Sequence, residues 1–198
     1  MVLFQSGNIN LKRQRIISIV GTRKITTSGI VFCEDLVEKL SIYNPVIVSG
    51  FAYGTDITAH KAAMKNNLQT IGCLAHGLNQ IYPKAHKKYM VDMEKNGGFF
   101  TDFWSSDNFD KNNFLKRNRV IAGLSEATIV IESAEKGGSL VTADIANSYN
   151  RDVFAVPGRI TDSQSMGCNN LIKYQKAHML TTASVSYTHL RAHETKAN

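Results

Sequence analysis

The sequence predicts an α/β protein in which a mostly parallel sheet carries helices on both faces. Short apolar, β-branched segments alternate along the chain with longer segments of helical spacing, and the connections between them are brief. Parallel strands need crossover helices, so this alternation favours parallel pairing. Glycine-rich breaks follow the apolar segments, which places candidate ligand loops at the carboxyl ends of the strands.

The first strand–helix unit begins at residues 16–20, a short β-branched run typical of a strand buried on both faces. The sequence GTRK at residues 21–24 interrupts this run, and a helix is predicted to follow with Thr27 or Ser28 as its N-cap. Helical spacing predicts the buried face of this helix, which comprises Ile30, Val31, Leu36, Val37 and Leu40.

The same pattern then repeats. Residues 46–48 and 70–74 predict the second and third strands. Asp56 is placed to cap the helix between them, and a further helix is expected between residues 83 and 95. Small residues on the earlier of these two helices suit close packing on a sheet, namely Ala59, Ala62 and Ala63.

The second half of the chain contains a long polar segment, residues 103–113, which predicts a surface loop. Strand and helix signals alternate around it, because β-branched runs are separated by segments with helical spacing. The expected strands are residues 99–101, 127–131 and 153–156, and the expected helices are residues 114–124 and 139–149.

The length of 198 residues fits one domain, with enough chain to bury a core without disulfides or metals. We expect this domain to occupy residues 1–184. Residues 185–198 lack strong periodicity and apolar content, which predicts a frayed or non-native tail such as a translated cloning artefact.

Composition and charge restrict the function classes. The sequence is 43% hydrophobic and 20% charged, and it has no apolar run of about 18 residues that would cross a membrane. Its 3 cysteines are far apart and odd in number, which favours a reducing cytoplasm over a disulfide framework. The net charge of +7 favours polyanionic partners.

Three loops of small residues are predicted at one edge of the sheet. The first, GTRK, carries Arg23 and Lys24 at a strand-to-helix turn, where backbone amides and the helix dipole can bind a phosphate. The second, SGFAYGTD, begins with Ser49 and Gly50, and its glycines permit close approach of a ligand. The third, GGSLVTA at residues 137–143, has Ser139 at the start of a helix. Ordinary turns and caps explain each loop alone, but together they predict an anion-binding rim.

The densest basic cluster is the sequence FLKRNR at residues 114–119. In a helix, Lys116 and Arg119 share a face, whereas Arg117 points elsewhere. Such a cluster is usually a solvated surface, but apolar residues follow it directly and anchor it to the core. Fixed cations beside the ring of Phe114 suit a single nucleic-acid strand, with phosphates on the cations and a base on the ring.

The motifs provide no catalytic set. The sequence has neither a G-x-S-x-G elbow nor a cysteine with an identifiable histidine partner. Glu132 follows a strand and is expected to face the rim, which makes it the one carboxylate to test as a general base. With neither three converging metal ligands nor a G-x-G-x-x-G or Walker A loop, we expect no metal and no cofactor.

A series of motifs resembles the DNA-processing protein A (DprA/Smf) family, in the family's own order. The first are IVGTR at residues 19–23, VSGFAYGTD at 48–56 with AH at 59–60, and a glycine with YP at 77–83. The others are KRNRVIAGLS at 116–125, GSLVTA at 138–143, VPG at 156–158 and GCN at 167–169. The match covers about residues 16–183, and this many motifs in sequence are highly specific.

The resemblance implies an extended Rossmann-like domain that binds single-stranded DNA in a basic pocket and forms a homodimer. It also implies a cytoplasmic binding protein, not an enzyme, which protects an incoming strand and delivers it to a RecA-type recombinase during natural transformation of competent cells. With the loop residues above, the candidate DNA-binding residues are Arg23, Lys24, Ser49, Gly50, Phe114, Lys116, Arg117, Arg119 and Ser139. Asn118 is expected to fix the local backbone.

The sequence also departs from the family pattern. Many members carry a helical module before this domain and a winged-helix-like module after it, and this chain has room for neither. The sequence QKA at residues 175–177 stands where the family often has Gly-Ala. The dimer surface is expected on a helix of the second half with exposed apolar positions.

Two other functions compete with strand binding. A nucleotide phosphoribohydrolase-like enzyme of the same Rossmann-like superfamily would carry a P-G-G-x-G-T-x-x-E signature, which EKGGSLVT at residues 135–142 matches poorly. Release of adenine from AMP would indicate such an enzyme. Alternatively, the domain only docks a partner protein, and a clean dimer that binds no strand would favour that function.

Overall fold

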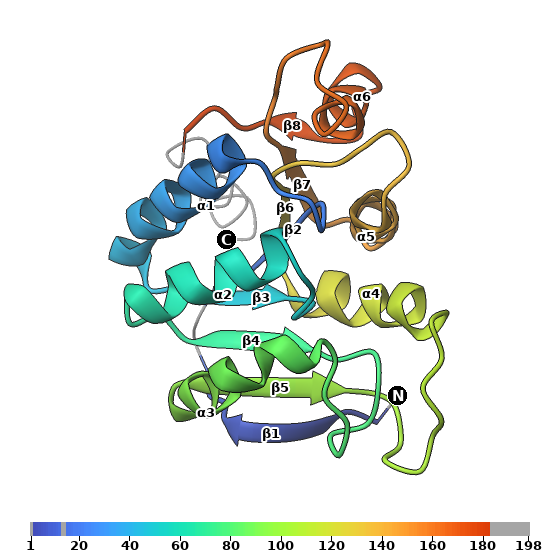
Figure 1. Ribbon diagram of the computed structural model, residues 1–198. Coiled ribbons are helices and arrows are strands. Elements are labelled where there is room, and N and C mark those ends of the chain that lie inside the picture. Colours follow the sequence, from blue (N-terminus) through green and yellow to red (C-terminus); the bar gives the residue numbers. More distant parts are fainter. Residues whose placement is uncertain (1, 13–14, 183–198) are drawn as a thin grey trace.

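The computed structural model describes residues 2–12 and 15–182 of the chain (Figure 1). At its centre lies an eight-stranded sheet with the order β1-β5-β4-β3-β2-β6-β7-β8. Strand β1 runs antiparallel to β5, and the other neighbours pair in parallel. The strands are β1 (Phe4–Asn8), β2 (Ile16–Val20), β3 (Val46–Ser49), β4 (Thr70–Cys73), β5 (Gly97–Thr101), β6 (Ala127–Val130), β7 (Asp152–Ala155) and β8 (His178–Met179).

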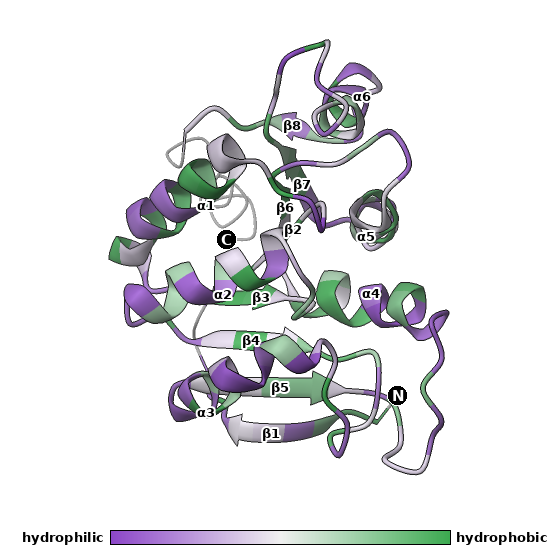
Figure 2. Cartoon of the chain, in the orientation of Figure 1, coloured by the Kyte–Doolittle hydropathy of each residue, from purple (hydrophilic) through white to green (hydrophobic). Residues whose placement is uncertain are grey.

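Helices cover both faces of this sheet, so the predicted α/β architecture is confirmed (Figure 2). Helices α1 and α2 enclose one apolar layer with β2, β6 and β7, and α4, α5 and α6 enclose the layer on the other face. Helix α3 packs beside β5. The helices are α1 (Thr27–Leu40), α2 (Thr55–Lys65), α3 (Lys87–Lys95), α4 (Asn113–Leu124), α5 (Gly138–Ser148) and α6 (Met166–Lys173), with 3-10 turns η1 (Ser41–Tyr43) and η2 (Lys84–His86).

The strand order reverses beside β2. From β2 the chain proceeds outward through β3, β4 and β5, and α4 then returns to place β6 on the other side of β2. Strands β7 and β8 continue outward from there. Crevices form at the carboxyl ends of strands where such a reversal occurs, because the two flanking loops lead in opposite directions. This topology therefore predicts a crevice between the loop that follows β2 and the loop that follows β6.

The start and the buried face of α1 differ from the sequence prediction. Thr26 is the N-cap, not Thr27 or Ser28, and its side chain accepts a hydrogen bond of 3.1 Å from the amide of Gly29. Val31 is 60% exposed. The helix is rotated slightly from the predicted orientation, and its buried residues are Gly29, Cys33, Leu36, Val37 and Leu40.

The sequence prediction missed both edge strands. Strand β1 has the polar sequence FQSGN, and its pairing relies on glycine in β5, because a Cβ at Gly98 would lie 2.0 Å from the carbonyl oxygen of Ser6. Strand β8 has only two residues. Both strands form by pairing with an existing sheet edge, so neither shows the local apolar pattern by which strands are predicted.

The three cysteines are buried and free, and burial raises the pKa of each thiol to about 12. Within residues 2–12 and 15–182, no helix is both long and apolar enough to cross a membrane. Among the same residues, no group of three or more His, Cys, Asp or Glu side chains could hold a metal ion. The predicted tail, residues 185–198, lies outside the described residues.

Candidate functional site

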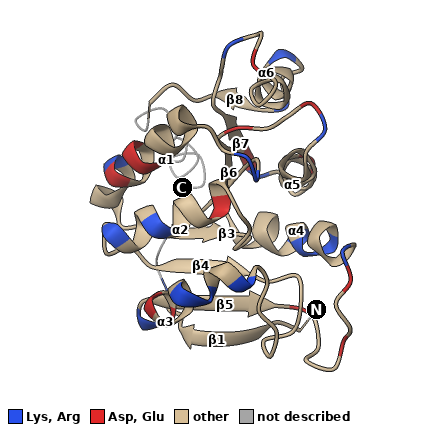
Figure 3. Cartoon of the chain, viewed as in Figure 1, with Lys and Arg blue, Asp and Glu red and all other residues tan. Residues whose placement is uncertain are grey.

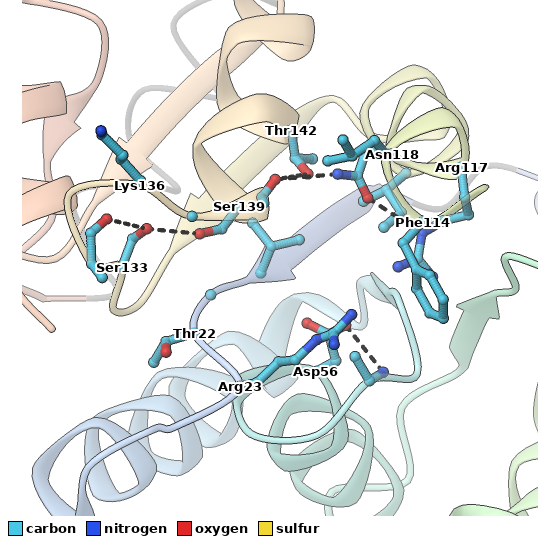
Figure 4. Close-up of a pocket in the computed structure, with 18 residues that line it drawn as sticks. Thr22, Arg23, Asp56, Phe114, Arg117, Asn118, Ser133, Lys136, Ser139 and Thr142 are labelled. Carbon is cyan, nitrogen blue, oxygen red and sulfur yellow. Dashed lines mark hydrogen bonds between the residues drawn. The ribbon is translucent and has the colours of Figure 1, made fainter. Parts of the chain in front are cut away.

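A cavity of about 290 Å³ opens at the carboxyl ends of β2, β3 and β6, where the strand order reverses (Figure 4). Its walls come from the three glycine loops, the first turn of α5 and one side of α4. Arg23 and Asp56 lie on one wall, and Asn118, Ser139 and Thr142 lie opposite them. The loops therefore meet at one edge of the sheet, as the sequence indicates.

The first turn of α5 lines one side of this cavity. Gly137, Gly138 and Ser139 line it, and no side chain among the described residues caps the helix start. A Cβ at Gly138 would meet no atom within 4 Å, so the backbone is open to a ligand there. Uncapped amides at a helix N-terminus, together with the helix dipole, attract phosphate.

Two neighbouring side chains hold this turn in place. Asn118 donates a hydrogen bond of 3.2 Å from Nδ2 to the carbonyl of Gly138, which ties α4 to α5. The Ser139 hydroxyl donates to Ser133 Oγ at 3.0 Å. Asn118 thus fixes the local backbone, as expected. Ser139 lines the cavity, but its hydroxyl group donates its hydrogen bond to Ser133 and not toward the cavity.

Arg23 reaches the cavity mouth from the loop after β2. Gly21 lets this loop cross the start of α2, because a Cβ there would lie 2.4 Å from Thr55 Oγ1. The loop is tied to its neighbours by Thr22, whose amide donates to the carbonyl of Glu132 at 2.7 Å. The guanidinium of Arg23 lies 5.2 Å from the ring centroid of Phe114, within cation–π range. Its charge is exposed at the mouth, available to a ligand.

Arg117 crosses the floor of the cavity. It is 5% exposed, and Nη1 donates to the carbonyl oxygens of Gly50, at 2.5 Å, and of Cys73. Burial lowers the pKa of its guanidinium, and the charge of Asp56 opposes that shift; arginine nevertheless stays protonated in proteins. Arg117 is therefore a fixed buried cation that holds β3, β4 and α4 together.

Asp56 faces Arg117 across the backbone of Gly50. A Cβ at Gly50 would lie 2.6 Å from both Arg117 Nη2 and Asp56 Oδ2, so only glycine leaves room for the two charges. Burial raises the pKa of the Asp56 carboxyl, and Arg117 and the amide of Ala52 lower it. The prediction that Asp56 caps α2 is wrong, because the N-cap is Gly54 and Asp56 lies in the first turn.

The other predicted residues lie around the cavity or beneath it. Ser49 is fully buried and donates to the carbonyl of Ile19 at 2.6 Å, so its role in the fold is structural. Lys24 and Lys116 are exposed but do not line the cavity. Arg119 is paired with Asp102. Of the predicted set, Arg23, Phe114, Arg117 and Ser139 line the cavity, and Gly50 lies against its floor.

Glu132 is engaged at the start of α1, away from the cavity. Its carboxylate accepts hydrogen bonds from the amide of Thr26 at 2.8 Å and from the hydroxyl of Thr26 at 2.5 Å. Both oxygens therefore stabilise the N-terminus of α1, where the helix dipole favours a negative charge. The position of Glu132 is therefore explained by its hydrogen bonds to the start of α1, and it does not require a role as a general base.

Replacing Glu132 with alanine is expected to lower the free energy of unfolding by about 2 kcal/mol, because it leaves the Thr26 donors without this acceptor. Thermal unfolding of Glu132→Ala and Glu132→Gln measures the effect, and glutamine should retain part of the stability. If the Glu132→Ala protein is as stable as the original chain but binds ligand more weakly, Glu132 belongs to the binding site.

Sequence reasoning missed one cation of the cavity wall. Lys136, which lines the cavity, stands immediately before the glycine pair, and this position beside a helix start was the available signal. The prediction that Arg117 lies on a different face of α4 from Lys116 and Arg119 is confirmed, because Arg117 is buried and the other two are exposed. Arg117 lies three and four residues before the buried Val120 and Ile121, so helical spacing places all three on the inner face.

Comparisons with known proteins identify the family of this chain. A model of the DNA recombination-mediator protein A family matches residues 1–191. The chain belongs to this family. The DNA processing protein DprA of Streptococcus pneumoniae is 37% identical over 173 residues, which cover 87% of this chain and 61% of that protein. DprA of Bacillus subtilis is 39% identical over 173 residues, 87% of this chain and 58% of that protein. The chain thus spans about three fifths of these relatives.

Solved structures of family members share the fold. The X-ray structure of DprA from Streptococcus pneumoniae superposes with a TM-score of 0.84 at 36% identity, over 92% of this chain and 64% of that chain. DprA from Helicobacter pylori, whose structure concerns its single-stranded DNA binding mode, gives 0.86 at 28% identity, over 96% and 86%. A molybdenum cofactor binding protein from Rippkaea orientalis gives 0.62 at 16% identity, over 91% and 98%, and shows a shared fold alone.

Proposed function

We propose that this chain binds single-stranded DNA, with the phosphate backbone held in the cavity at the strand-order reversal. The observation that carries the proposal is the convergence of Arg23, Arg117 and Lys136 with the uncapped start of α5. Amides and fixed cations at one edge of a sheet suit a polyanion. Family membership and the Helicobacter pylori relative, which concerns single-stranded DNA, agree with this ligand.

Basic residues extend beyond the cavity. Figure 3 shows lysine and arginine on α4 and in the loop that follows β2. Lys24 and Lys116 belong to this outer set, and the chain as a whole carries a net charge of +7. We propose that these outer cations contact further phosphates along the strand, and that binding is largely indifferent to base sequence.

The wider role follows from the family. We propose that the chain acts as a homodimer in the cytoplasm, where it protects an incoming strand and passes it to a RecA-type recombinase during natural transformation. The family description, recombination mediator, is what favours the last step. On this proposal the domain holds the strand and does not cleave it.

A salt titration tests strand binding. If about four cations contact phosphates, log K falls with log salt at a slope of roughly −3 for single-stranded DNA. Lys136→Ala and Arg23→Ala should each reduce the slope by about 0.7, the value of one contact. Fluorescence anisotropy with a labelled oligonucleotide, single-stranded and duplex, provides the measurement.

Lys65→Ala is the matched control, since this exposed lysine ends α2 at the opposite edge of the sheet. Its slope should equal that of the original chain. Affinity that is independent of salt, or unchanged by both cavity substitutions, would refute the proposed site. Release of adenine from AMP would favour the phosphoribohydrolase hypothesis, although both oxygens of Glu132 are engaged by Thr26.

A further inference from the structure

Three aromatic rings from separate segments meet beside the cavity. The ring centroids of Tyr82 and Phe109 are 5.2 Å apart, those of Tyr82 and Phe114 are 5.4 Å apart, and those of Phe109 and Phe114 are 5.9 Å apart. Tyr82 follows β4, Phe109 lies in the long loop before α4, and Phe114 lies in the first turn of α4. We call these three residues the aromatic platform.

Hydrogen bonds from side chains of one loop to the backbone of another position the platform. Asn79 donates from its side-chain amide to the carbonyl of Ser105 at 2.9 Å, and Gln80 donates to the carbonyl of Asp107 at 2.9 Å. Gly77 permits this approach, because a Cβ there would lie 2.6 Å from the Cα of Ser105. The loops that carry Tyr82 and Phe109 are therefore bonded to each other, and these contacts fix the positions of the two rings.

Two rings of the platform are exposed, and the third, Phe114, is half-buried. Tyr82 is 39% exposed and Phe109 is 44% exposed, so the rings cluster without entering the core. The platform is also continuous with the cavity, because Phe114 lines the cavity and Arg23 lies over its ring. A ligand that leaves the cavity past Arg23 meets these rings next.

We propose that the aromatic platform stacks bases of the strand whose phosphates occupy the cavity. This inference rests on the proposed function and extends it to Tyr82 and Phe109, which then add binding energy through the bases rather than through charge. Every base has a π-face, so such stacking adds affinity without demanding a particular sequence.

The charges around the platform favour bases over phosphates there. The long loop, residues 103–113, carries Asp107, Asp110 and Lys111, so its net charge is negative and disfavours a phosphate. The two carboxylates are used within the loop, since Asp107 accepts from the amide of Trp104 at 3.0 Å and Asp110 from the amide of Asn112 at 2.8 Å. A strand passing this loop is expected to turn its phosphates toward Arg23 and its bases toward the rings.

The test compares two labelled probes with the same number of phosphates, oligothymidylate and a fully abasic chain. The Tyr82→Ala/Phe109→Ala variant should bind oligothymidylate about tenfold more weakly, and its affinity for the abasic chain should not change. Tyr82→Phe should bind both probes like the original chain. Tyr43→Ala is the matched control, because Tyr43 has the same exposed fraction of 39% and lies in η1, at the opposite end of the sheet.

Tyr82→Leu/Phe109→Leu is the second variant, because leucine keeps apolar bulk between the loops but offers no π-face; it should show the same selective loss. Equal losses on both probes would mean that the rings only hold the loops, and no loss on either would mean that they stack nothing. Each result overturns the inference while strand binding stands. An original chain that binds neither probe would overturn the proposed function and the inference with it.

Discussion

Arg117→Ala is expected to lower the free energy of unfolding by about 3–5 kcal/mol, the usual cost of removing one member of a buried charged network. The substitution leaves the carbonyls of Gly50 and Cys73 without their donor, and it leaves the Asp56 carboxylate facing no cation on this side. For a chain of this length the melting temperature should fall by about 10 °C. Thermal denaturation followed by circular dichroism measures the change.

Two variants sharpen this prediction. Lys116→Ala removes a neighbouring exposed cation from the same helix and should change the stability by no more than about 0.5 kcal/mol. Arg117→Lys keeps the charge but not the planar array of donors, so it should recover only part of the loss. If Arg117→Ala melts like the original chain, the buried cation does not join α4 to the sheet.

Gly50→Ala is expected to destabilise the fold by about 3 kcal/mol, at the upper end of the cost of overpacking. The new methyl group would lie 2.6 Å from both Arg117 Nη2 and Asp56 Oδ2, and the backbone on each side is fixed by its own contacts. Because the two charges must separate, the cavity floor changes as well, and binding of single-stranded DNA should weaken with stability. Denaturant titration and anisotropy measure the two effects.

Gly138→Ala provides the comparison at another glycine of the same cavity. A Cβ there would meet nothing within 4 Å, so the free energy of unfolding should stay within about 0.5 kcal/mol of the original value. If the two alanine variants are equally stable, the space between Asp56 and Arg117 is not what requires glycine at residue 50.

The α/β alternation, the approximate elements and the meeting of the glycine loops could be predicted from sequence. Buried strands such as β2 and β3 consist mainly of β-branched residues, because both of their faces are covered. Loops that follow parallel strands lie at the same edge of the sheet. The alternation of strands and helices was therefore enough to predict that Arg23 and Gly50 lie close together. Family motifs identified the same positions.

Spacing separated Arg117 from Lys116 and Arg119, but it could not predict what Arg117 contacts. Periodicity states which residues share a helix face, but which face meets the sheet depends on the partner surface. In this fold Val120 and Ile121 pack into the core and carry Arg117 inward with them, and Lys116 and Arg119 are left exposed. The basic cluster is therefore not one charged surface. It consists of a buried cation, Arg117, and two exposed neighbours, Lys116 and Arg119.

Local sequence by itself determined strands β2 to β7, the helices and the candidate loops, since backbone propensity and apolar period act over a few residues. Only the tertiary structure decided the strand order, the pairing of β1 and β8, the facing of Asp56 and Arg117, and the meeting of Tyr82, Phe109 and Phe114. Those features join residues far apart in the chain, and packing and desolvation select such contacts only when the whole sheet has formed.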